Sequence, residues 1–386
     1  MMLAAMLKNE NVLLLERGER LGRKLSATGN GQGNVTNLAV GKTDYFSQSA
    51  QGNSRVKTFL KAYGANEMLS FLESLGGLFL PDERGRVYPS GRQASAITDL
   101  LRFSLSDNVC VRLGAYVSAV QKTKNGFEVT VQETDGENRY LADKIVLCAG
   151  GKAAKNFGTD GNGYALAKNL SHSVTPLYPS LVQLKTETGD IKGLKGLRVN
   201  GASVSAKVAG QPVANVRGDV IFTDYGVSGD AIFRLSAFVA DKIGKSDVSL
   251  SIDFLPDVTE ETLRETLRNR ENKRGLTDSE RLCGIVNNQI GRAIVKRFGA
   301  DGDDLARGVK AFSLPVTGSL GFDYAQVTKG GVRLEEVDDC LQSVFVKGLY
   351  FAGEILDVDG ECGGFNLQWA FTSAKIVANA IERGQV

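Results

Sequence analysis

Residues 1–17, MMLAAMLKNENVLLLER, decide the fold that we expect for this chain. Residues 1–7 are apolar and rich in good helix formers, residues 8–11 form a polar turn, and residues 12–15 are a short apolar run that stops at Glu16. A helix that leads into a buried strand ending in an acid is typical of the second half of a dinucleotide-binding βαβ unit. The stretch therefore predicts an α/β fold with a doubly wound parallel sheet.

In such a unit the acid at the end of the second strand accepts hydrogen bonds from the adenosine ribose, so Glu16 is a candidate ribose ligand. The glycine fingerprint of the unit lies about 20 residues before this acid, which places it outside the chain. An acid that merely ends a strand is the alternative interpretation of Glu16.

A second βα unit is expected at the far end of the chain, where residues 347–384 read as a strand, a glycine-rich loop and a long helix that begins near Asn366. The first turn of a helix has free backbone N–H groups and the positive end of the helix dipole, which favour an anion or an electron-rich ligand edge. Gly363 and Gly364, directly before this helix, are therefore candidate ligand contacts.

Between these two ends, helical periodicity is expected at 56–76, and residues 114–151 predict a small antiparallel meander with turn signals at Asn125-Gly126 and Asp135-Gly136. The pattern then changes twice. Alternating residues suggest a β-rich module, and a charged helical pattern follows, with Thr277 and Glu280 spaced as a capping box at one helix start. We expect three parts, namely a discontinuous nucleotide-binding domain at 1–180 and 318–386, a β-rich inserted domain at 181–256 with 311–330, and a helical subdomain at 257–310.

A second glycine-rich segment, SATGNGQGNVTN at 26–37, has three glycines in five residues and several short polar side chains. Glycines let backbone amides approach a ligand closely, which suits a pyrophosphate or the edge of a heteroaromatic ring. Arg23 and Lys24 add positive charge just upstream, and a flexible surface loop is the alternative. Ala149 and Gly150 follow an expected buried strand at 144–148 and allow a similar close approach, with a plain tight turn as the alternative.

Composition points to a small-molecule ligand. The 386 residues carry a net charge of +2, which gives no electrostatic bias toward nucleic acid or a membrane surface. We see no membrane span and no signal peptide, so we expect a cytoplasmic location. Five scattered cysteines predict free thiols, and the single histidine, His172, is expected in a loop or at the surface, so we expect no metal site.

Several longer motifs match a known family. GRKLSATGNGQGNVTN (22–37) and FAGEILDVDGECGGFNLQWAF (351–371) resemble the FAD-dependent flavoproteins that include aminoacetone oxidase and the BaiN-type oxidoreductases. Supporting matches are GRVYPSGRQAS (85–95), IVLCAGG (145–151), DVIFTDYGVSGDAI (219–232) and VTKGGVRLEEV (327–337). The resemblance implies a glutathione-reductase-type FAD domain with an inserted β-barrel-like domain and a small helical domain.

The resemblance also implies roles for the candidate residues. Glu16 would hold the adenosine ribose and the Val117 backbone would meet the adenine, while Gly353 and Glu354 would touch the ribityl-phosphate region. The remaining candidate FAD contacts are Arg23, Lys24, Thr28, Gly29, Gly33, Asn34, Asn37, Ala149, Gly150, Gly363, Gly364, Phe365, Asn366 and Leu367.

The chain departs from the family pattern in three ways. The family opens with a strand and a GGGxxG-type loop before a helix like 1–7, and since these residues contain neither, we expect a truncated or mis-started reading frame. Asp224 stands where relatives tend to have histidine, which leaves Asp224 and Tyr225 as catalytic candidates. Cys362 stands where relatives often have threonine, and its thiol could be acidified near a helix N-terminus, although a passive small residue is the alternative.

These observations predict an FAD-dependent oxidoreductase, and possible oxidase, that acts on an amine, an amino ketone or an unsaturated ketone by hydride transfer. Oxygen or NAD(P)H would be the redox partner, and no separate NAD(P) domain is expected because no second glycine fingerprint follows a strand. Two alternatives are a degenerate, non-catalytic relative and a tRNA-modifying flavoprotein.

Overall fold

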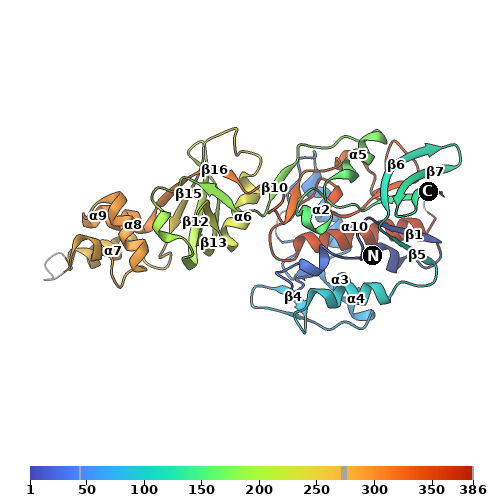
Figure 1. Cartoon of the computed structure of the whole chain (residues 1–386). Coiled ribbons are helices and arrows are strands. Elements are labelled where there is room, and N and C mark those ends of the chain that lie inside the picture. The colour runs from blue at the N-terminus through green and yellow to red at the C-terminus, as the bar shows by residue number, and fades with distance from the viewer. Residues whose placement is uncertain (43–44, 271–275, 385–386) are drawn as a thin grey trace. The chain divides into compact units, whose positions relative to one another are not determined.

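The computed structural model describes residues 1–42, 45–270 and 276–384 (Figure 1). The chain divides into two compact units. Unit 1 comprises Met1–Tyr178 and Val327–Val386, and unit 2 comprises Pro179–Gln326. Unit 2 is thus one continuous segment, whereas unit 1 is assembled from the two ends of the chain.

Unit 1 contains the parallel strands that the opening stretch predicts. Helix α1 (Met2–Met6) leads into β1 (Val12–Glu16), which pairs in parallel with β5 (Val109–Leu113). Near the other end of the chain, β18 (Leu349–Phe351) pairs in parallel with β9 (Ile145–Leu147). Across the described ranges these two pairs are separate two-stranded sheets. The predicted helix and the predicted strand ending in Glu16 are both confirmed.

The strand expected at 144–148 is shorter and less buried than predicted. It covers only Ile145–Leu147, and Cys148 is exposed. In the part of the chain that the structure describes, β9 has one strand neighbour, β18. Its first two residues are therefore only half-buried, although their apolar character predicts a fully enclosed strand.

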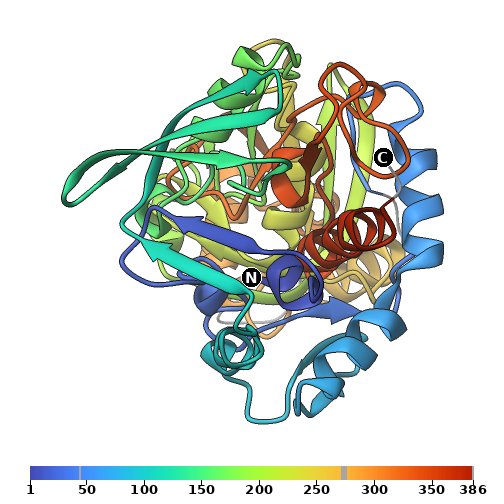
Figure 2. The same ribbon diagram turned by 90° about the vertical axis from the view of Figure 1, so that its right-hand side faces the viewer.

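The long C-terminal helix is the central element of unit 1. Helix α10 (Phe365–Glu382) buries Trp369 and Phe371 and packs against α1, α2 (Gly52–Ala62) and α3 (Ala65–Ser74), as its position beside the N-terminal segment in Figure 2 shows. The continuous helical pattern expected at 56–76 is broken into α2 and α3, because Gly64 begins a new helix and its N–H donates to Glu67 Oε2 at 2.9 Å.

Unit 1 also contains two three-stranded sheets. An antiparallel meander contains β6 (Tyr116–Thr123), β7 (Gly126–Glu133) and β8 (Gly136–Ala142), and its tight turns lie at the predicted Asn-Gly and Asp-Gly pairs. The other sheet has the order β2-β4-β3. The remaining elements of the unit are β2 (Thr36–Asn37), β3 (Phe79–Pro81), β4 (Arg86–Pro89), α4 (Ala94–Phe103), α5 (Asn162–Asn169) and β17 (Val327–Lys329), and β10 (Tyr178–Ser180) begins at the last residue of its first segment.

Unit 2 contains a closed antiparallel barrel with the strand order β11-β14-β13-β12-β15-β16, which confirms the expected barrel-like architecture. Its strands are β11 (Leu184–Thr186), β12 (Arg198–Val208), β13 (Gln211–Phe222), β14 (Gly226–Ser228), β15 (Val248–Asp253) and β16 (Phe312–Ser319). A helix within this segment, α6 (Asp230–Val239), was not predicted. It packs on β13 and buries Ile232 and Leu235, so alternation alone did not reveal it.

A helical segment lies between β15 and β16. It contains α7 (Glu260–Arg268), α8 (Asn288–Phe298) and α9 (Gly302–Lys310). The predicted capping box is present, because Thr277 and Glu280 exchange both of its hydrogen bonds at the start of a short 3₁₀ turn. In the described ranges, no helix combines the length and apolar character needed to cross a bilayer.

His172 lies in a loop, as one of the two predicted alternatives had it, but it is buried in the core and not at the surface. The residue is 3% exposed, its ring packs edge-on against Phe351 at a centroid distance of 4.6 Å, and Nε2 lies 2.7 Å from Ser343 Oγ. Burial lowers the pKa of His172 from 6.5, and Glu336, 3.3 Å from Nδ1, only partly opposes this shift. His172 is therefore kept neutral in the folded protein.

We expect this histidine to make the stability of unit 1 depend on pH. Its folded-state pKa lies below the unfolded value, so the unfolded state binds more protons in that interval and the free energy of unfolding falls as the pH drops through 6.5. Urea unfolding at several values between about pH 7.5 and about pH 5.5 measures this slope. H172Q should flatten it, and an unchanged slope in that variant would assign the pH dependence to other groups.

Candidate functional site

The N-terminus of α10 carries the most distinctive backbone of unit 1. Gly363 and Gly364 both have left-handed φ angles, +120° and +101°, and Gly364 is the residue that precedes the first helical turn. The Gln368 N–H donates to Gly364 O at 3.0 Å. The preceding N–H groups, up to that of Leu367, have no acceptor within the helix and carry its partial positive charge.

The loop before α10 is held in place by side chains from this helix and from a distant segment. Asn366 accepts a hydrogen bond from Gly360 N–H and donates one to Gly360 O, both at 2.9 Å. Tyr45 Oη donates to Phe365 O at 2.9 Å, and its ring lies edge-on against the Phe365 ring. Burial raises the pKa of Tyr45, so its phenol stays protonated. No sequence motif had pointed to Tyr45.

The structure brings the glycine-rich segment 26–37 against this helix end. Asn37 Nδ2 donates to Gly363 O at 3.1 Å, while its Oδ1 accepts from Ala39 N–H at 2.9 Å. Asn34 is 7% exposed and lies so close to Gly364 that a Cβ built on the glycine would be 2.2 Å from Asn34 Oδ1. Among the described residues this buried oxygen has no hydrogen-bond partner.

The segment 26–37 is also anchored to α4. Gly33 has a φ of +77°, and a Cβ on it would lie 2.8 Å from the Ala94 Cα, so only glycine allows this approach. Ala94 N–H donates to Gly31 O at 2.8 Å, and Gly33 N–H donates to Thr28 O at 3.0 Å. Gly29, at φ +59°, packs against the Asn34 backbone in the same way. The loop is therefore fixed by glycine-dependent contacts.

Lys24 and Glu354 form a half-buried ion pair with a Nζ–Oε2 distance of 2.7 Å. The other oxygen of Glu354 accepts from Thr328 N–H at 2.9 Å, so both carboxylate oxygens have protein partners. A Cβ on Gly151 would lie 2.7 Å from Glu354 Oε1. The backbone that follows Ala149, at Gly150 and Gly151, therefore lies close to the Glu354 carboxylate. The adjacent Gly353 has a φ of +80° and open space on its Cβ side.

A second set of polar residues lies near the end of β1. Glu16 Oε1 accepts from Gly18 N–H at 2.7 Å, and its other oxygen has no hydrogen bond from the described residues. Val117 O accepts a 3.4 Å hydrogen bond from Asn162 Nδ2. Arg17, which the sequence reasoning passed over although it follows Glu16 directly, pairs with Asp160 at 2.8 Å.

This ion pair sets the charge state of Asp160. Burial raises the pKa of Asp160, but the hydrogen bonds from Arg17 and from Asn162 N–H outweigh it and hold the pKa below its usual range. The Arg17 guanidinium also lies 5.4 Å from the centre of the Tyr116 ring. Nearby, Arg23 donates to Asn156 O at 2.9 Å.

The three catalytic candidates belong to different units of the chain. Asp224 and Tyr225 belong to unit 2, where Asp224 pairs with Lys195 at 2.8 Å and both side chains are about two-thirds exposed, 64% and 66%. The Lys195 ammonium lowers the pKa of Asp224. Cys362 is half-buried in the loop before α10, in unit 1. No group of His, Cys, Asp or Glu in the described ranges could hold a metal ion.

The arrangement at α10 fits one edge of a flavin ring. The pyrimidine part of a flavin has carbonyl oxygens that accept hydrogen bonds and one N–H that donates. The first turn of α10 offers unpaired N–H donors, and the buried Asn34 Oδ1 is an acceptor without a partner among the described residues. Both kinds of group are thus present side by side.

The chain is similar to several known proteins. The family model described as the HI0933-like protein Rossmann domain matches residues 1–380. The chain is 36% identical to the 3-dehydro-bile acid delta(4,6)-reductase of Clostridium scindens over 386 residues, 96% of this chain and 92% of that protein. It is 29% identical to the ribosomal RNA dihydrouridine synthase of Escherichia coli K12, over 94% of this chain and 90% of that protein.

Among solved structures, the 3-ketosteroid-delta4-(5alpha)-dehydrogenase of Rhodococcus jostii RHA1 aligns with a TM-score of 0.48 at 14% identity, over 98% of this chain and 94% of that chain. The resemblance carried by the end motifs is confirmed by the family match, which covers both motifs and the segment between them. The chain therefore belongs to the HI0933-like Rossmann family, and it is an FAD-dependent oxidoreductase.

Proposed function

We propose that the protein reduces a carbon–carbon double bond conjugated to the ring ketone of a steroid-like acid. The observation that carries this proposal is the 36% identity to a 3-dehydro-bile acid delta(4,6)-reductase, which extends over 96% of the chain. Of the three substrate classes that the motifs allow, amines, amino ketones and unsaturated ketones, this relative favours the last.

When bound, FAD supplies the hydride for such a reduction. The contribution of the chain is to bind the ring and stabilise charge. The free N–H groups at the start of α10 would favour negative charge on the pyrimidine edge of the reduced ring. Asn34 Oδ1 would accept a hydrogen bond from that edge, and Glu16 would hold the ribose with the carboxylate oxygen that Gly18 does not contact.

Other residues would position these groups. Tyr45 and Asn366 fix the loop before α10, and the pair of Lys24 and Glu354 holds the end of β18 against segment 22–37. Asp224, Tyr225 and Cys362 stay candidates for proton transfer, and NAD(P)H is the candidate donor that reduces the flavin.

A second candidate substrate is a uridine in ribosomal RNA, because the chain is also 29% identical to a ribosomal RNA dihydrouridine synthase. Formation of dihydrouridine also saturates a double bond conjugated to a carbonyl group, so the same site chemistry would serve. The net charge of +2 favours the small molecule, since binding to RNA draws its affinity from a cationic surface.

A single-turnover experiment tests the proposal. The FAD-loaded protein is reduced under nitrogen and mixed separately with a 3-keto-4,6-diene bile acid, with a uridine-containing ribosomal RNA fragment and with buffer. We expect flavin absorbance to return only with the dienone, together with a product two hydrogens richer. If only the RNA fragment reoxidises the flavin, the substrate is the uridine in ribosomal RNA. Bleaching of the oxidised protein by aminoacetone would instead identify an amine oxidase, and no reaction with any of them would favour a non-catalytic relative.

A further inference from the structure

Two arginines share one aromatic ring beside the glycine-rich segment 26–37. Tyr88, on β4, has the Arg92 guanidinium 4.5 Å and the Arg86 guanidinium 5.9 Å from its ring centre. Arg86 forms an ion pair with Asp82 at 2.6 Å, and this contact helps to lower the pKa of Asp82. The two cations therefore differ in whether their charge is neutralised.

Arg92 has no acidic partner in the described part of the chain. Besides the Tyr88 ring, its guanidinium contacts the neutral amide of Gln32, with 3.2 Å between Nη1 and Oε1. Both Arg92 and Gln32 are exposed. An exposed guanidinium that is stacked on a ring and oriented by an amide keeps free N–H donors in a fixed plane.

The backbone at Arg92 is unusual. Its φ is +47°, in the left-handed region that a residue with a Cβ rarely enters. Arg92 N–H donates to Pro89 O at 2.8 Å, which closes the turn that holds this conformation. Strain of this kind persists where the surroundings impose it, often at ligand sites. Here the turn places the arginine next to Gln32.

The location connects this arginine with the candidate flavin site. Ala94, two residues later, donates to Gly31 O, and Gly33 packs against Ala94. The same segment contributes Asn34 and Asn37, which lie against Gly364 and Gly363. Arg92 therefore contacts the same loop that meets the start of α10.

We propose that Arg92 and the Tyr88 ring form an anion-binding site. This site binds a carboxylate or phosphate group of a ligand that reaches the flavin. This inference rests on the proposed function. The steroid acid proposed as substrate ends in a carboxylate remote from its ring ketone, and NADPH carries a 2′-phosphate. Either group offers two oxygens to a guanidinium that can donate two parallel hydrogen bonds.

The test compares an acid with its methyl ester. R92Q removes the charge and keeps a polar side chain, and R102Q is the matched control. Arg102 is also exposed and stacked, 4.3 Å from the Phe103 ring, but it forms an ion pair with Asp99. It lies near the C-terminal end of α4, whereas Arg92 precedes the N-terminal end. Equilibrium binding of the acid and of the ester to each FAD-loaded protein is measured by calorimetry, and KM is measured for NADPH and NADH.

If the ligand is the carboxylate, R92Q should weaken binding of the acid about tenfold and leave binding of the ester, kcat and the KM for NADPH unchanged. If the ligand is the phosphate, R92Q should raise the KM for NADPH but not for NADH. The proposal is overturned if R92Q behaves like R102Q in all assays, or if acid and ester weaken equally. Because binding is measured without turnover, selective loss of acid binding would support Arg92 even if the dienone is not reduced.

Discussion

Replacement of Gly364 by alanine is expected to abolish FAD binding and to lower the free energy of unfolding by about 3 kcal/mol. The added Cβ would lie 2.2 Å from Asn34 Oδ1 and 2.4 Å from Thr36 O, distances at which one of the two segments must move. The φ of +101° adds backbone strain that alanine cannot relieve. The groups that would move are Asn34 Oδ1 and the N-terminus of α10, which are the groups that would hold the edge of the flavin.

Gly363 supplies the matched control. Its φ, +120°, is equally unfavourable for alanine, but the nearest atoms to its Cβ position lie 3.7 Å away. G363A should therefore cost only the strain, about 1–2 kcal/mol, and retain FAD. Flavin absorbance after gel filtration and urea unfolding of both variants provide the measurements. Equal losses in the two variants would show that the contact with Asn34 does not limit cofactor binding.

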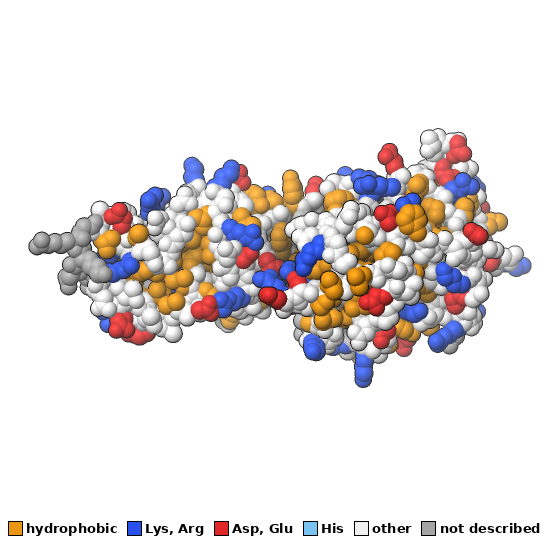
Figure 3. Space-filling view, turned by 90° about the horizontal axis from the view of Figure 1, so that it is seen from below, with side chains coloured by type: hydrophobic (Ala, Val, Ile, Leu, Met, Phe, Trp, Pro, Cys, Tyr) orange, Lys and Arg blue, Asp and Glu red, His pale blue; other side chains and the backbone are white. Residues whose placement is uncertain are grey.

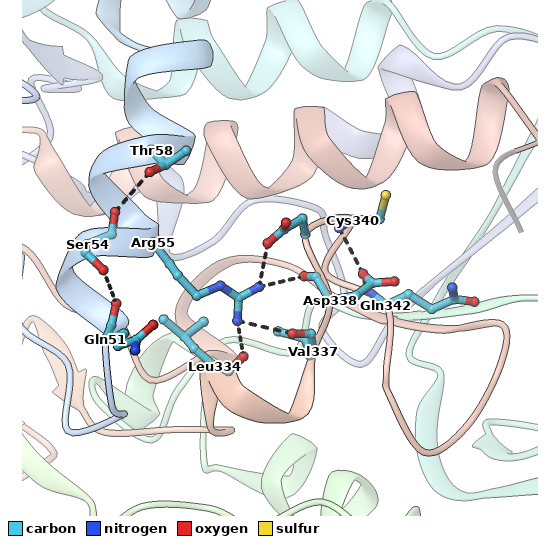
Figure 4. Close-up of polar contacts among 10 residues, drawn as sticks. Gln51, Ser54, Arg55, Thr58, Leu334, Val337, Asp338, Cys340 and Gln342 are labelled. Atoms are coloured by element: carbon cyan, nitrogen blue, oxygen red, sulfur yellow. Dashed lines mark hydrogen bonds and ion pairs between the residues drawn. The ribbon is translucent and has the colours of Figure 1, made fainter.

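Replacement of Arg55 by methionine is expected to cost about 3 kcal/mol of stability without changing the flavin site directly. Arg55, on α2, donates to the carbonyl oxygens of Leu334, Val337 and Asp338 and pairs with Asp339 (Figure 4). The guanidinium is the group that collects these oxygens into one turn, and a methionine of similar length would leave them without those donors.

Two further variants on α2 sharpen this prediction. R55K keeps the charge but lacks the planar fork that reaches several acceptors, so it should recover little of the lost stability. K61M removes an exposed cation from the same helix and should change stability by less than about 0.5 kcal/mol. Urea midpoints of the three variants give the comparison, and a stable R55M protein would mean that water replaces the guanidinium at no cost.

The sequence was most informative where one local pattern determines one element. The run Val12–Leu15 followed by Glu16 predicted β1, the Asn-Gly and Asp-Gly pairs predicted the two hairpins, and the glycines before Phe365 predicted the start of α10. Each of these depends on residues that are neighbours in the chain. The family motifs added the cofactor and the inserted barrel.

The parts that the sequence could not predict depend on contacts between distant segments. The closeness of Asn34 to Gly364 joins residues more than 300 positions apart, and the burial of His172 depends on Phe345 and Phe351. Helix α6 was missed because the β-rich pattern on both sides of it dominated the interpretation. The left-handed conformation of Arg92 also has no signature in its residue type, since arginine rarely adopts it.

The division of unit 1 into two chain segments affects how the protein is made. Unit 2 is continuous and can close its barrel as soon as residue 326 has left the ribosome. The first 178 residues, in contrast, must wait for β18 and α10, which at about 5–20 residues per second takes roughly 10–40 seconds. During that time the surfaces that α10 later covers, on α1, α2 and α3, face solvent. The nascent first segment is therefore the stage of synthesis at which aggregation and chaperone binding should be greatest.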